Sequence, residues 1–329
     1  PLLRCPRLGA RVGVGNLWIK DEAQMPTGTF KSRGLSAAIT MAKELGAERV
    51  AIPTAGNAGG ALAAYAARAG LEAYVFMPED APAINRYEAA LAGAHVFLVD
   101  GLITDCGRIV EAGKERMGWF DVSTLKEPYR LEGKKTMGLE LAEQLDWTLP
   151  DVILYPTGGG TGLIGMWKAF AELAALGWVD ADRRPRMVAV QSDGCCPIVR
   201  AFERGERFAE PFEHPTTIAH GIRVPAAVGD FMILDALYES GGRAVAVDEA
   251  RIRDWMQLAA STEGVSVGPE AAVCVGAAEK LAEEGWIRPG ERVVLFNCGA
   301  AQKAPDAMAR ELPRLDKNAP DWDRIAAGG

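Results

Sequence analysis

The stretch RVAIPTAGNAGGALAAYAARAGLEAYVFMP (residues 49–78) decides the fold. It contains an apolar run (49–54), a glycine-bearing turn, an alanine-rich segment (58–69) and a second apolar run (72–78). Short runs rich in β-branched and aromatic residues predict strands, and the alanine-rich segment between them predicts a helix. Two buried strands joined by a helix indicate a parallel, helix-covered sheet.

The same alternation continues along the chain. It predicts further strands at 94–100, 119–123, 151–156, 186–191, 243–247 and 291–297. It predicts helices near 82–91, 103–116, 133–145, 163–176, 196–204, 249–262 and 270–284. The stretch 205–230, rich in proline, glycine and charge, predicts a long irregular connection, and the tail after Lys303 is expected at the periphery.

We therefore predict an α/β fold with two open, twisted, mostly parallel sheets flanked by helices. A smaller domain is expected at residues 36–140, and a larger one is expected to combine residues 1–35 with 141–329. In open sheets of this kind, ligands bind beyond the carboxyl ends of the strands. The loops that follow the strands are therefore the first places to search for chemistry.

The composition excludes several classes of function. The chain has 329 residues, 49% of them apolar, and a net charge of −8, which disfavours nucleic-acid binding because phosphates need clustered Lys and Arg. No apolar run reaches membrane-spanning length. The six cysteines have no CxxC spacing and the three histidines no metal-ligand pattern, so we expect neither a metal site nor disulfides, and a cytoplasmic location.

A lysine stands at the start of another predicted helix, in PTGTFKSRG (26–34). Leu35, Ala38 and Ile39 follow at helical spacing, which places Lys31 at or near the first turn. The positive end of the helix and burial would both lower the pKa of the amine, as Schiff-base chemistry requires. The segment taken alone favours a solvent-facing lysine, because most lysines are exposed.

Two glycine-bearing loops follow predicted strands. In PTAGNAGG (53–60), Asn57 can cap the next helix, and the free amides there suit a carboxylate or phosphate; a simple capped helix explains the same pattern. PTGGGTGLIG (156–165) has four glycines within five residues, more than a turn requires, so it favours a phosphate cradle. It lacks the GxxxxGK[ST] pattern of a nucleotide P-loop.

A fourth stretch, VVLFNCGAAQK (293–303), ends a buried strand at Cys298. This thiol would project into the same crevice, although a lone cysteine is more typical of a core. Taken together and in this order, the four motifs resemble fold-type II pyridoxal-phosphate enzymes, the tryptophan-synthase-β-like group, and within it the threonine synthases. The similarity includes GNLWIKDEAQMPTGTFKSRG (15–34) and FDVSTLKEPYRLEGKKTMGLELAEQL (120–145), and extends to about Lys303.

The resemblance implies a role for each motif. Lys31, preceded by Phe30, matches the lysine that forms a Schiff base with pyridoxal 5′-phosphate and moves protons. Asn57 matches the residue that hydrogen-bonds the ring hydroxyl, and Cys298 falls where a neutral residue faces the pyridine nitrogen. The cofactor phosphate is expected to bind at Gly158, Gly159, Gly160, Thr161 and Gly162. The substrate carboxylate is expected to bind at Thr54, Ala55, Gly56 and Ala58.

The resemblance also implies a second anion site. Arg130 matches the arginine that holds a substrate phosphate, which suits guanidinium geometry. The neighbouring lysines are equally consistent with a solvated helix start: Lys126, Lys134 and Lys135.

The chain departs from the family pattern in three places. At residues 28–34 we expect GSFKDRG, and the chain has Thr29 and Ser32 in place of the expected serine and aspartate. At residues 269–272 it has PEAA where we expect PEGA. CGAAQKAP (298–305) replaces a TGSGLKY-like stretch, which alters the floor of the pyridine pocket. This last departure bears on the identity of the substrate more than on cofactor binding.

The resemblance implies a carbon–oxygen lyase that converts O-phosphohomoserine and water to L-threonine and phosphate. Two alternatives that keep the cofactor are a serine or threonine dehydratase and a β-replacement paralogue such as a cysteate synthase. Cys298 followed by Gly299 leans towards the dehydratases, which are similar at this point. A third alternative, outside the class, is a non-catalytic ligand-binding α/β protein. A homodimer is the assembly expected from the family.

Overall fold

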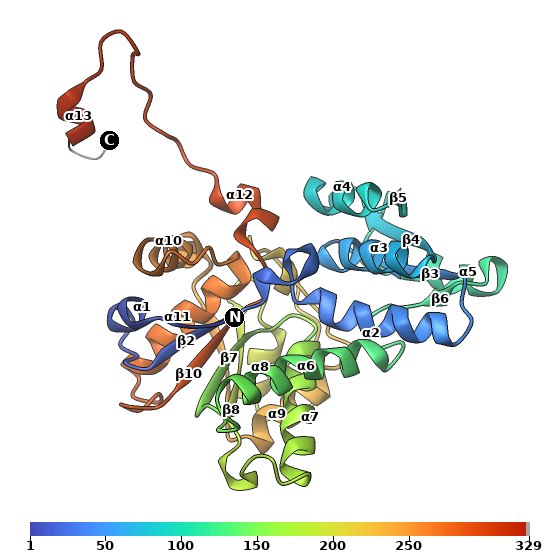
Figure 1. Cartoon of the computed structure of the whole chain (residues 1–329), viewed down its shortest axis with the longest axis horizontal. Helices are drawn as coiled ribbons and strands as arrows, with labels where there is room; N and C mark the ends of the chain where they lie inside the picture. The colour runs from blue at the N-terminus through green and yellow to red at the C-terminus, as the bar shows by residue number, and fades with distance from the viewer. Residues whose placement is uncertain (327–329) are drawn as a thin grey trace.

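Two separate sheets organise the chain in the computed structural model, which describes residues 1–326 (Figure 1). The six-stranded sheet has the order β1-β2-β10-β7-β8-β9, and all its pairs are parallel except β1 with β2. Its strands are β1 (Leu2–Arg4), β2 (Leu17–Asp21), β7 (Val152–Pro156), β8 (Arg186–Ser192), β9 (Arg243–Val247) and β10 (Val293–Asn297).

The second sheet has four parallel strands in the order β5-β4-β3-β6. They are β3 (Arg49–Pro53), β4 (Glu72–Pro78), β5 (His95–Val99) and β6 (Phe120–Asp121). Helix α3 (Asn57–Ala69) connects β3 to β4, so the βαβ unit predicted from residues 49–78 is present. The prediction of two mostly parallel, helix-flanked sheets is confirmed.

Helices cover both faces of the six-stranded sheet. Alternate side chains of a strand point to opposite faces, and β7 shows this directly. Val152 and Leu154 lie in one buried cluster, with α1 (Pro6–Arg11), α10 (Ile252–Glu263) and α11 (Pro269–Glu283). Ile153 and Tyr155 lie in the other, with α6 (Tyr129–Gln144), α7 (Thr161–Ala175), α8 (Pro197–Glu203) and α9 (Asp230–Glu239).

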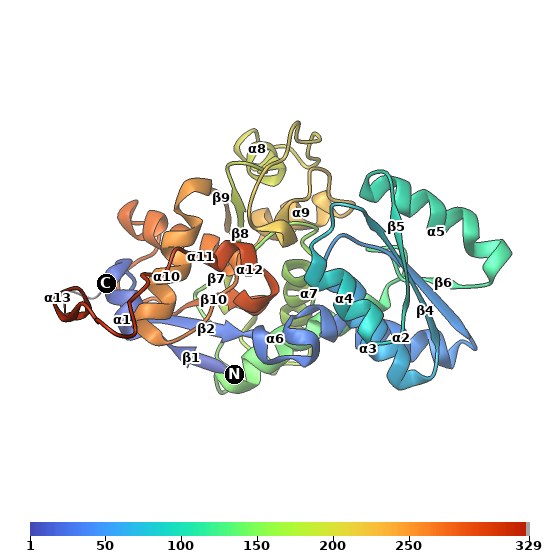
Figure 2. The same cartoon turned by 90° about the horizontal axis from the view of Figure 1, so that it is seen from above.

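The four-stranded sheet is covered in the same way. Val50 and Ile52 of β3 face a cluster with α2 (Lys31–Glu44) and α3, while Ala51 faces Trp119 and α5 (Ile103–Met117). Helix α4 (Ala83–Leu91) packs beside α3, and Figure 2 shows this group to one side of the six-stranded sheet.

Helices α2 and α6 join the two sheets. They approach so closely that a Cβ on Gly133 of α6 would lie 2.2 Å from the Arg33 carbonyl oxygen of α2. Helix α6 also packs along α7. Residues of α6 that face α2 and α7 therefore lie between these two helices.

Several predicted boundaries differ from the structure. Helix α6 begins at Tyr129 rather than at 133, because Glu127 Oε2 accepts the amides of Tyr129 and Arg130 and caps the helix four residues earlier. The predicted helix 249–262 starts with a 3₁₀ turn, Glu249–Arg251. The alternation of apolar runs and helical segments in the sequence did not predict α1, β1, β2 or α9. Of the predicted strand 119–123, only Phe120–Asp121 pair.

The connection 205–230 is irregular apart from the 3₁₀ turn His220–Ile222 and the first residue of α9. The tail carries α12 (Pro305–Met308) and α13 (Trp322–Ala326), which projects away from the body (Figure 1). We propose residues 36–140 as the smaller domain and the remainder as the larger; residues 327–329 of the latter lie outside the described residues. None of the described helices is long and apolar enough to cross a membrane.

Candidate active site

The end of β10 positions the start of α2. The Phe30 amide donates a hydrogen bond of 3.0 Å to the Cys298 carbonyl oxygen, and the Ala300 amide donates one of 2.9 Å to the Gly28 carbonyl. Between these bonds Thr29 and Gly299 form an antiparallel bridge. Because β10 lies between β2 and β7, this pairing brings the first turn of α2 to the carboxyl edge of the six-stranded sheet.

The residues that depart from the family pattern beside Lys31 are both buried. Ser32 donates a hydrogen bond to the Pro26 carbonyl, and its hydroxyl lies 3.0 Å from Thr27 Oγ1. Thr27 has a φ of +61°, a conformation that a branched residue rarely adopts. Ser32 therefore ties the turn that precedes Lys31 to the first turn of α2. The Thr29 hydroxyl has no hydrogen-bond partner within residues 1–326.

The Lys31 amine lies 4.3 Å from the centroid of the Phe30 ring. Burial of the amine, helped by the positive charge of Arg130, lowers the pKa of Lys31 to about 8, against the opposing effects of Cys298 and Glu270. A substantial fraction of the amine is therefore neutral at mildly alkaline pH, and a neutral amine is nucleophilic. The segment taken alone favoured a solvent-facing lysine, and the structure corrects this, because Lys31 is only partly exposed and its amine lies against the Phe30 ring.

Cys298 follows β10 and is only 6% exposed. Burial is the main cause that raises the pKa of its thiol to about 12, so the sulfur stays protonated and neutral at physiological pH. Tyr155, at the end of the adjacent strand β7, has a buried hydroxyl without a partner among the described residues. The floor of the site beside Lys31 is therefore uncharged and polar.

The loop Thr54–Ala58 opens helix α3, which packs against the 26–28 turn. Thr54 Oγ1 accepts the Gly56 amide at 3.1 Å and fixes the turn. In the part of the chain that the structure describes, the amides of Ala55, Asn57 and Ala58 have no acceptor. They form an anion site of the kind expected for a substrate carboxylate.

Asn57 carries a buried, unsatisfied acceptor. Its Oδ1 atom has no hydrogen-bond partner in residues 1–326. An unpaired buried acceptor is costly, and it is rare unless a ligand donor completes it. A ring hydroxyl would supply such a donor.

The loop Gly158–Gly162 connects β7 to α7. Within the described chain, the amides from Gly158 to Leu163 have no acceptor. A Cβ on Gly159 would meet only the Thr124 methyl group, at 3.9 Å, so this glycine leaves room beside the free amides for a phosphate to approach.

The other glycines of this loop are also required by packing. Gly160 has a φ of +67°, and a Cβ on Gly162 would lie 1.9 Å from the Tyr155 hydroxyl. A Cβ on Gly158 would lie 2.8 Å from Val224. The number of glycines alone is therefore weaker support for a phosphate than the sequence suggested, and the free amides are the stronger support.

Helix α6 contributes two buried cations one turn apart. Arg130 is 5% exposed and donates to the Val122 carbonyl at 2.8 Å and to Thr124 Oγ1 at 3.3 Å. Lys134 is 0% exposed, and its amine lies 3.4 Å from Thr161 Oγ1. Among the described residues, neither has a carboxylate within ion-pair distance.

The other two lysines of the basic stretch do not join the site. Lys126 is exposed. Lys135 pairs with Glu132 at 2.6 Å and with Glu172 at 2.8 Å. For Lys126 and Lys135, the structure therefore favours the alternative interpretation, a charge cluster outside the site.

Glu270 is a candidate site residue that was not predicted from the sequence. Its Oε1 accepts the Gly221 amide at 2.8 Å, and its charge opposes the lowering of the Lys31 pKa. The only sign of it in the sequence was the PEAA stretch at 269–272. There the departure from the family pattern is at Ala271, and the carboxylate of Glu270 was not considered.

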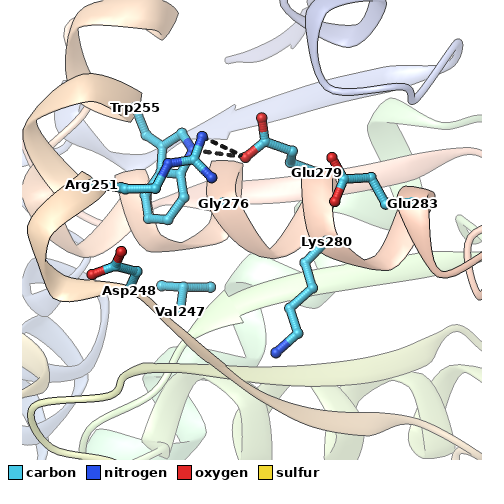
Figure 3. Close-up of a pocket in the computed structure, with 8 residues that line it drawn as sticks. All are labelled: Val247, Asp248, Arg251, Trp255, Gly276, Glu279, Lys280 and Glu283. Atoms are coloured by element: carbon cyan, nitrogen blue, oxygen red, sulfur yellow. Dashed lines mark hydrogen bonds and ion pairs between the residues drawn. The ribbon is translucent and has the colours of Figure 1, made fainter.

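A separate hollow of about 290 Å³ lies between α10 and α11 (Figure 3). In it, Arg251 pairs with Glu279 at 2.8 Å and stacks 4.6 Å from the Trp255 ring centroid. None of its lining residues belongs to the loops described above: Val247, Asp248, Arg251, Trp255, Gly276, Glu279, Lys280 and Glu283.

The residues present fit the phosphorylated aldehyde cofactor that the sequence predicts. Lys31 offers a partly neutral amine, Asn57 an unsatisfied acceptor, and the Gly158–Gly162 loop free amides with room beside Gly159. Cys298 offers a neutral thiol.

Comparisons with known proteins agree with this fit. A protein-family model described as "Pyridoxal-phosphate dependent enzyme" matches residues 1–299. A threonine synthase from Methanocaldococcus jannaschii is 38% identical over 94% of this chain and 76% of its own length. A threonine synthase from Mycobacterium tuberculosis is 32% identical over 96% of this chain and 84% of its own.

Solved structures show the same fold at lower identity. Maize serine racemase, with 22% identity, superposes with a TM-score of 0.79 over 100% of this chain and 92% of that one. A threonine deaminase from Solanum lycopersicum, also at 22% identity, has a TM-score of 0.78 over 93% and 86%.

Proposed function

The chain belongs to the pyridoxal-phosphate dependent enzymes and, among them, to the threonine synthase family, and we propose that it converts O-phosphohomoserine and water to L-threonine and phosphate. The net change breaks the bond between Cγ and the phosphate oxygen and one Cβ–H bond, and forms a Cβ–OH bond from water and a Cγ–H bond. The protons lost from Cβ and from water balance those gained by Cγ and by the released phosphate.

Arg130 is the observation that carries this substrate. Its guanidinium is buried and in the described chain forms no ion pair, and the charges of Glu127 and Asp121 offset its burial only in part, since its pKa is lowered. A buried unpaired charge is unfavourable unless a ligand of opposite charge completes the site. The planar guanidinium suits a phosphate, which O-phosphohomoserine carries and serine and threonine lack.

The cofactor is pyridoxal 5′-phosphate, which when bound supplies an electron sink for negative charge on the substrate carbons. We propose that its aldehyde carbon attaches to Lys31 Nζ as a Schiff base and that Phe30 packs in the cofactor site. Asn57 would accept from the ring hydroxyl, and Cys298 would face the pyridine nitrogen as a neutral partner. The phosphate would be held by Gly158, Gly159, Gly160, Thr161 and Gly162.

The substrate is oriented by the protein at its two ends. Thr54 fixes a turn in which the amides of Ala55, Asn57 and Ala58 can hold the carboxylate, while Gly56 permits close approach. Arg130 holds the phosphate at the other end. In this proposal the two contacts would hold Cα, Cβ and Cγ between them and present them to Lys31.

Lys31 carries the proton transfers. Its lowered pKa allows Nζ to accept a proton from Cα near neutral pH and to donate it again. The amine can then serve the transfers that release phosphate from Cγ and allow water to add at Cβ. A single amine with a pKa of about 8 suits both directions, because it is close to the working pH.

A dehydratase remains the second candidate, because Cys298 gives a neutral partner for the ring. The assay that separates the two measures phosphate released from O-phosphohomoserine and ketoacid formed from threonine. The proposal expects the first reaction to dominate. Ketoacid formation without phosphate release would favour the dehydratase.

We also propose a homodimer and a cytoplasmic location. The support for both is the resemblance to biosynthetic threonine synthases. The dimer can be checked by sedimentation of the loaded enzyme.

A further inference from the structure

We propose that Lys134 is the charge partner of the phosphate group held by the Gly158–Gly162 loop, so that helix α6 provides one cation for each of two neighbouring phosphates. The inference rests on the proposed function, because it requires both a phosphorylated cofactor and a phosphorylated substrate. Lys134 is then a cofactor-binding residue, and Arg130, one turn earlier, serves the substrate.

The first support is the burial of a charge without a counter-ion. Lys134 is fully buried, and none of the salt bridges in the described chain includes it. Glu127 is the acidic residue that acts on its pKa, and one Glu127 oxygen already accepts the amides of Tyr129 and Arg130. A buried ammonium in this position needs an anion that the described protein does not supply.

The second support is where the amine lies. Lys134 Nζ is 3.4 Å from Thr161 Oγ1, in the first residue of α7. The amides of Gly158 to Leu163 in the same loop lack acceptors among the described residues, and a Cβ on Gly159 would meet only the Thr124 methyl group, at 3.9 Å. The free amides, the positive end of a 15-residue helix and the Lys134 amine thus converge on one place.

The third support is the arrangement of the neighbouring cations. The amines of Lys31 and Lys134 each lie 4.3 Å from the centroid of the Phe30 ring. Burial, followed by the charges of Lys31 and Arg130, lowers the pKa of Lys134 well below its usual value. A bound phosphate dianion would offset the repulsion among these cations. An uncharged group next to Lys134 would not.

The spacing along α6 assigns the two phosphates. Arg130 and Lys134 are four residues apart and therefore on the same side of the helix. Arg130 reaches Thr124, which precedes α6, while Lys134 reaches Thr161. Thr124 itself lies beside the loop, since its methyl group is 3.9 Å from a Cβ built on Gly159, whereas Lys134 contacts a residue of the loop directly. The direct contact assigns the cofactor phosphate to Lys134, which leaves the substrate phosphate to Arg130.

The test titrates apoprotein with pyridoxal 5′-phosphate and, separately, with pyridoxal, which lacks the phosphate. The variants are Lys134→Met and Lys134→Gln, with Lys135→Met as the matched control on the same helix. Because charge-assisted hydrogen bonds are strong, we expect Lys134→Met to weaken pyridoxal 5′-phosphate binding by about tenfold to a hundredfold. The dissociation constant for pyridoxal should change by less than about twofold, which is the resolution of such titrations.

A second measurement keeps the inference testable if Lys134→Met folds poorly. Inorganic phosphate should raise the melting temperature of wild-type and Lys135→Met apoprotein by the same amount, and should raise that of Lys134→Gln less, because only the Arg130 site remains. Equal stabilisation of all three proteins by phosphate would overturn the inference.

Three other outcomes would also overturn it. Lys134→Met could bind pyridoxal 5′-phosphate as tightly as Lys135→Met does. It could lose pyridoxal and pyridoxal 5′-phosphate equally, which indicates a packing role. It could keep its cofactor affinity and show a raised KM for O-phosphohomoserine, which assigns Lys134 to the substrate phosphate.

The failure of the proposed function is distinguishable from these outcomes. If wild-type protein releases no phosphate from O-phosphohomoserine but binds its cofactor in a Lys134-dependent way, the proposed function fails and the inference about Lys134 stands.

Discussion

The Phe30 amide donates a hydrogen bond of 3.0 Å to the Cys298 carbonyl oxygen, and this bond joins two residues that lie at opposite ends of the sequence. It fixes the start of α2 against the end of β10. Lys31 and the Cys298 side chain consequently act on each other's pKa, and an amine and a neutral thiol share one site.

Arg130→Met should reduce kcat/KM for O-phosphohomoserine by about a hundredfold, mainly by raising KM, since it removes a buried phosphate partner. Cofactor absorbance should be unchanged, because Lys134 and the Gly158–Gly162 loop remain. Steady-state phosphate release measures the effect, and Lys126→Met, on an exposed side chain of the same stretch, is the control. Unchanged kinetics in Arg130→Met would contradict the assignment.

Asn57→Ala should affect the apoprotein and the loaded enzyme in opposite directions. The Oδ1 atom has no partner within residues 1–326, so its removal should leave the free energy of unfolding of the apoprotein unchanged or raise it by up to about 1 kcal/mol. Cofactor affinity should fall by about two- to tenfold, since one hydrogen bond is lost. Urea unfolding and absorbance titration measure the two effects.

A cofactor analogue without the ring hydroxyl provides the control for Asn57. It should bind wild-type protein and Asn57→Ala equally well. A loss of affinity for this analogue in the variant would mean that Asn57 acts through the fold of its loop.

The pH dependence of Lys31 follows from its lowered pKa. Acylation requires the neutral amine, so in apoprotein the rate at Lys31 should rise with pH and reach half its maximum near pH 8, rather than near the usual lysine value of 10.5. In Arg130→Met the midpoint should move upward, because a nearby positive charge is absent. Peptide mass spectrometry after timed acylation measures both midpoints, and a midpoint near 10.5 in wild-type protein would refute the buried environment.

Two glycines of one loop should respond differently to the same substitution. Gly162→Ala places a methyl group 1.9 Å from the Tyr155 hydroxyl and should destabilise the apoprotein by about 1–3 kcal/mol. Gly159→Ala meets nothing closer than 3.9 Å and should leave the apoprotein stable, while its methyl group obstructs phosphate binding. Thermal unfolding and cofactor titration separate the two effects; a Gly159→Ala protein with normal cofactor affinity would place the phosphate elsewhere.

Much of the fold was predictable because the strands of both sheets are short, apolar and separated by helical segments. The strands 72–78 and 243–247 were predicted at their observed bounds. The start of α6 was not, because its cap depends on the carboxylate of Glu127 reaching two amides. Local periodicity contains no information about that contact.

The candidate site was predictable as a set of motifs but less so residue by residue. Ser32 departs from the family pattern, and its part in the turn became clear only when Pro26 and Thr27 were placed beside it. Lys134 could not be distinguished from Lys135 by sequence, because both follow Arg130 on one helix. Burial separates them: one lies against Thr161, and the other is paired with Glu132 and Glu172.

The most direct test of the account is reduction of the loaded enzyme with borohydride, followed by peptide mass spectrometry. The account predicts loss of the visible cofactor absorbance and a stable pyridoxyl adduct on Lys31, with no adduct in Lys31→Ala, whose activity should fall by about 10²- to 10⁴-fold. An adduct on any other lysine, or a colourless protein after addition of pyridoxal 5′-phosphate, would contradict it.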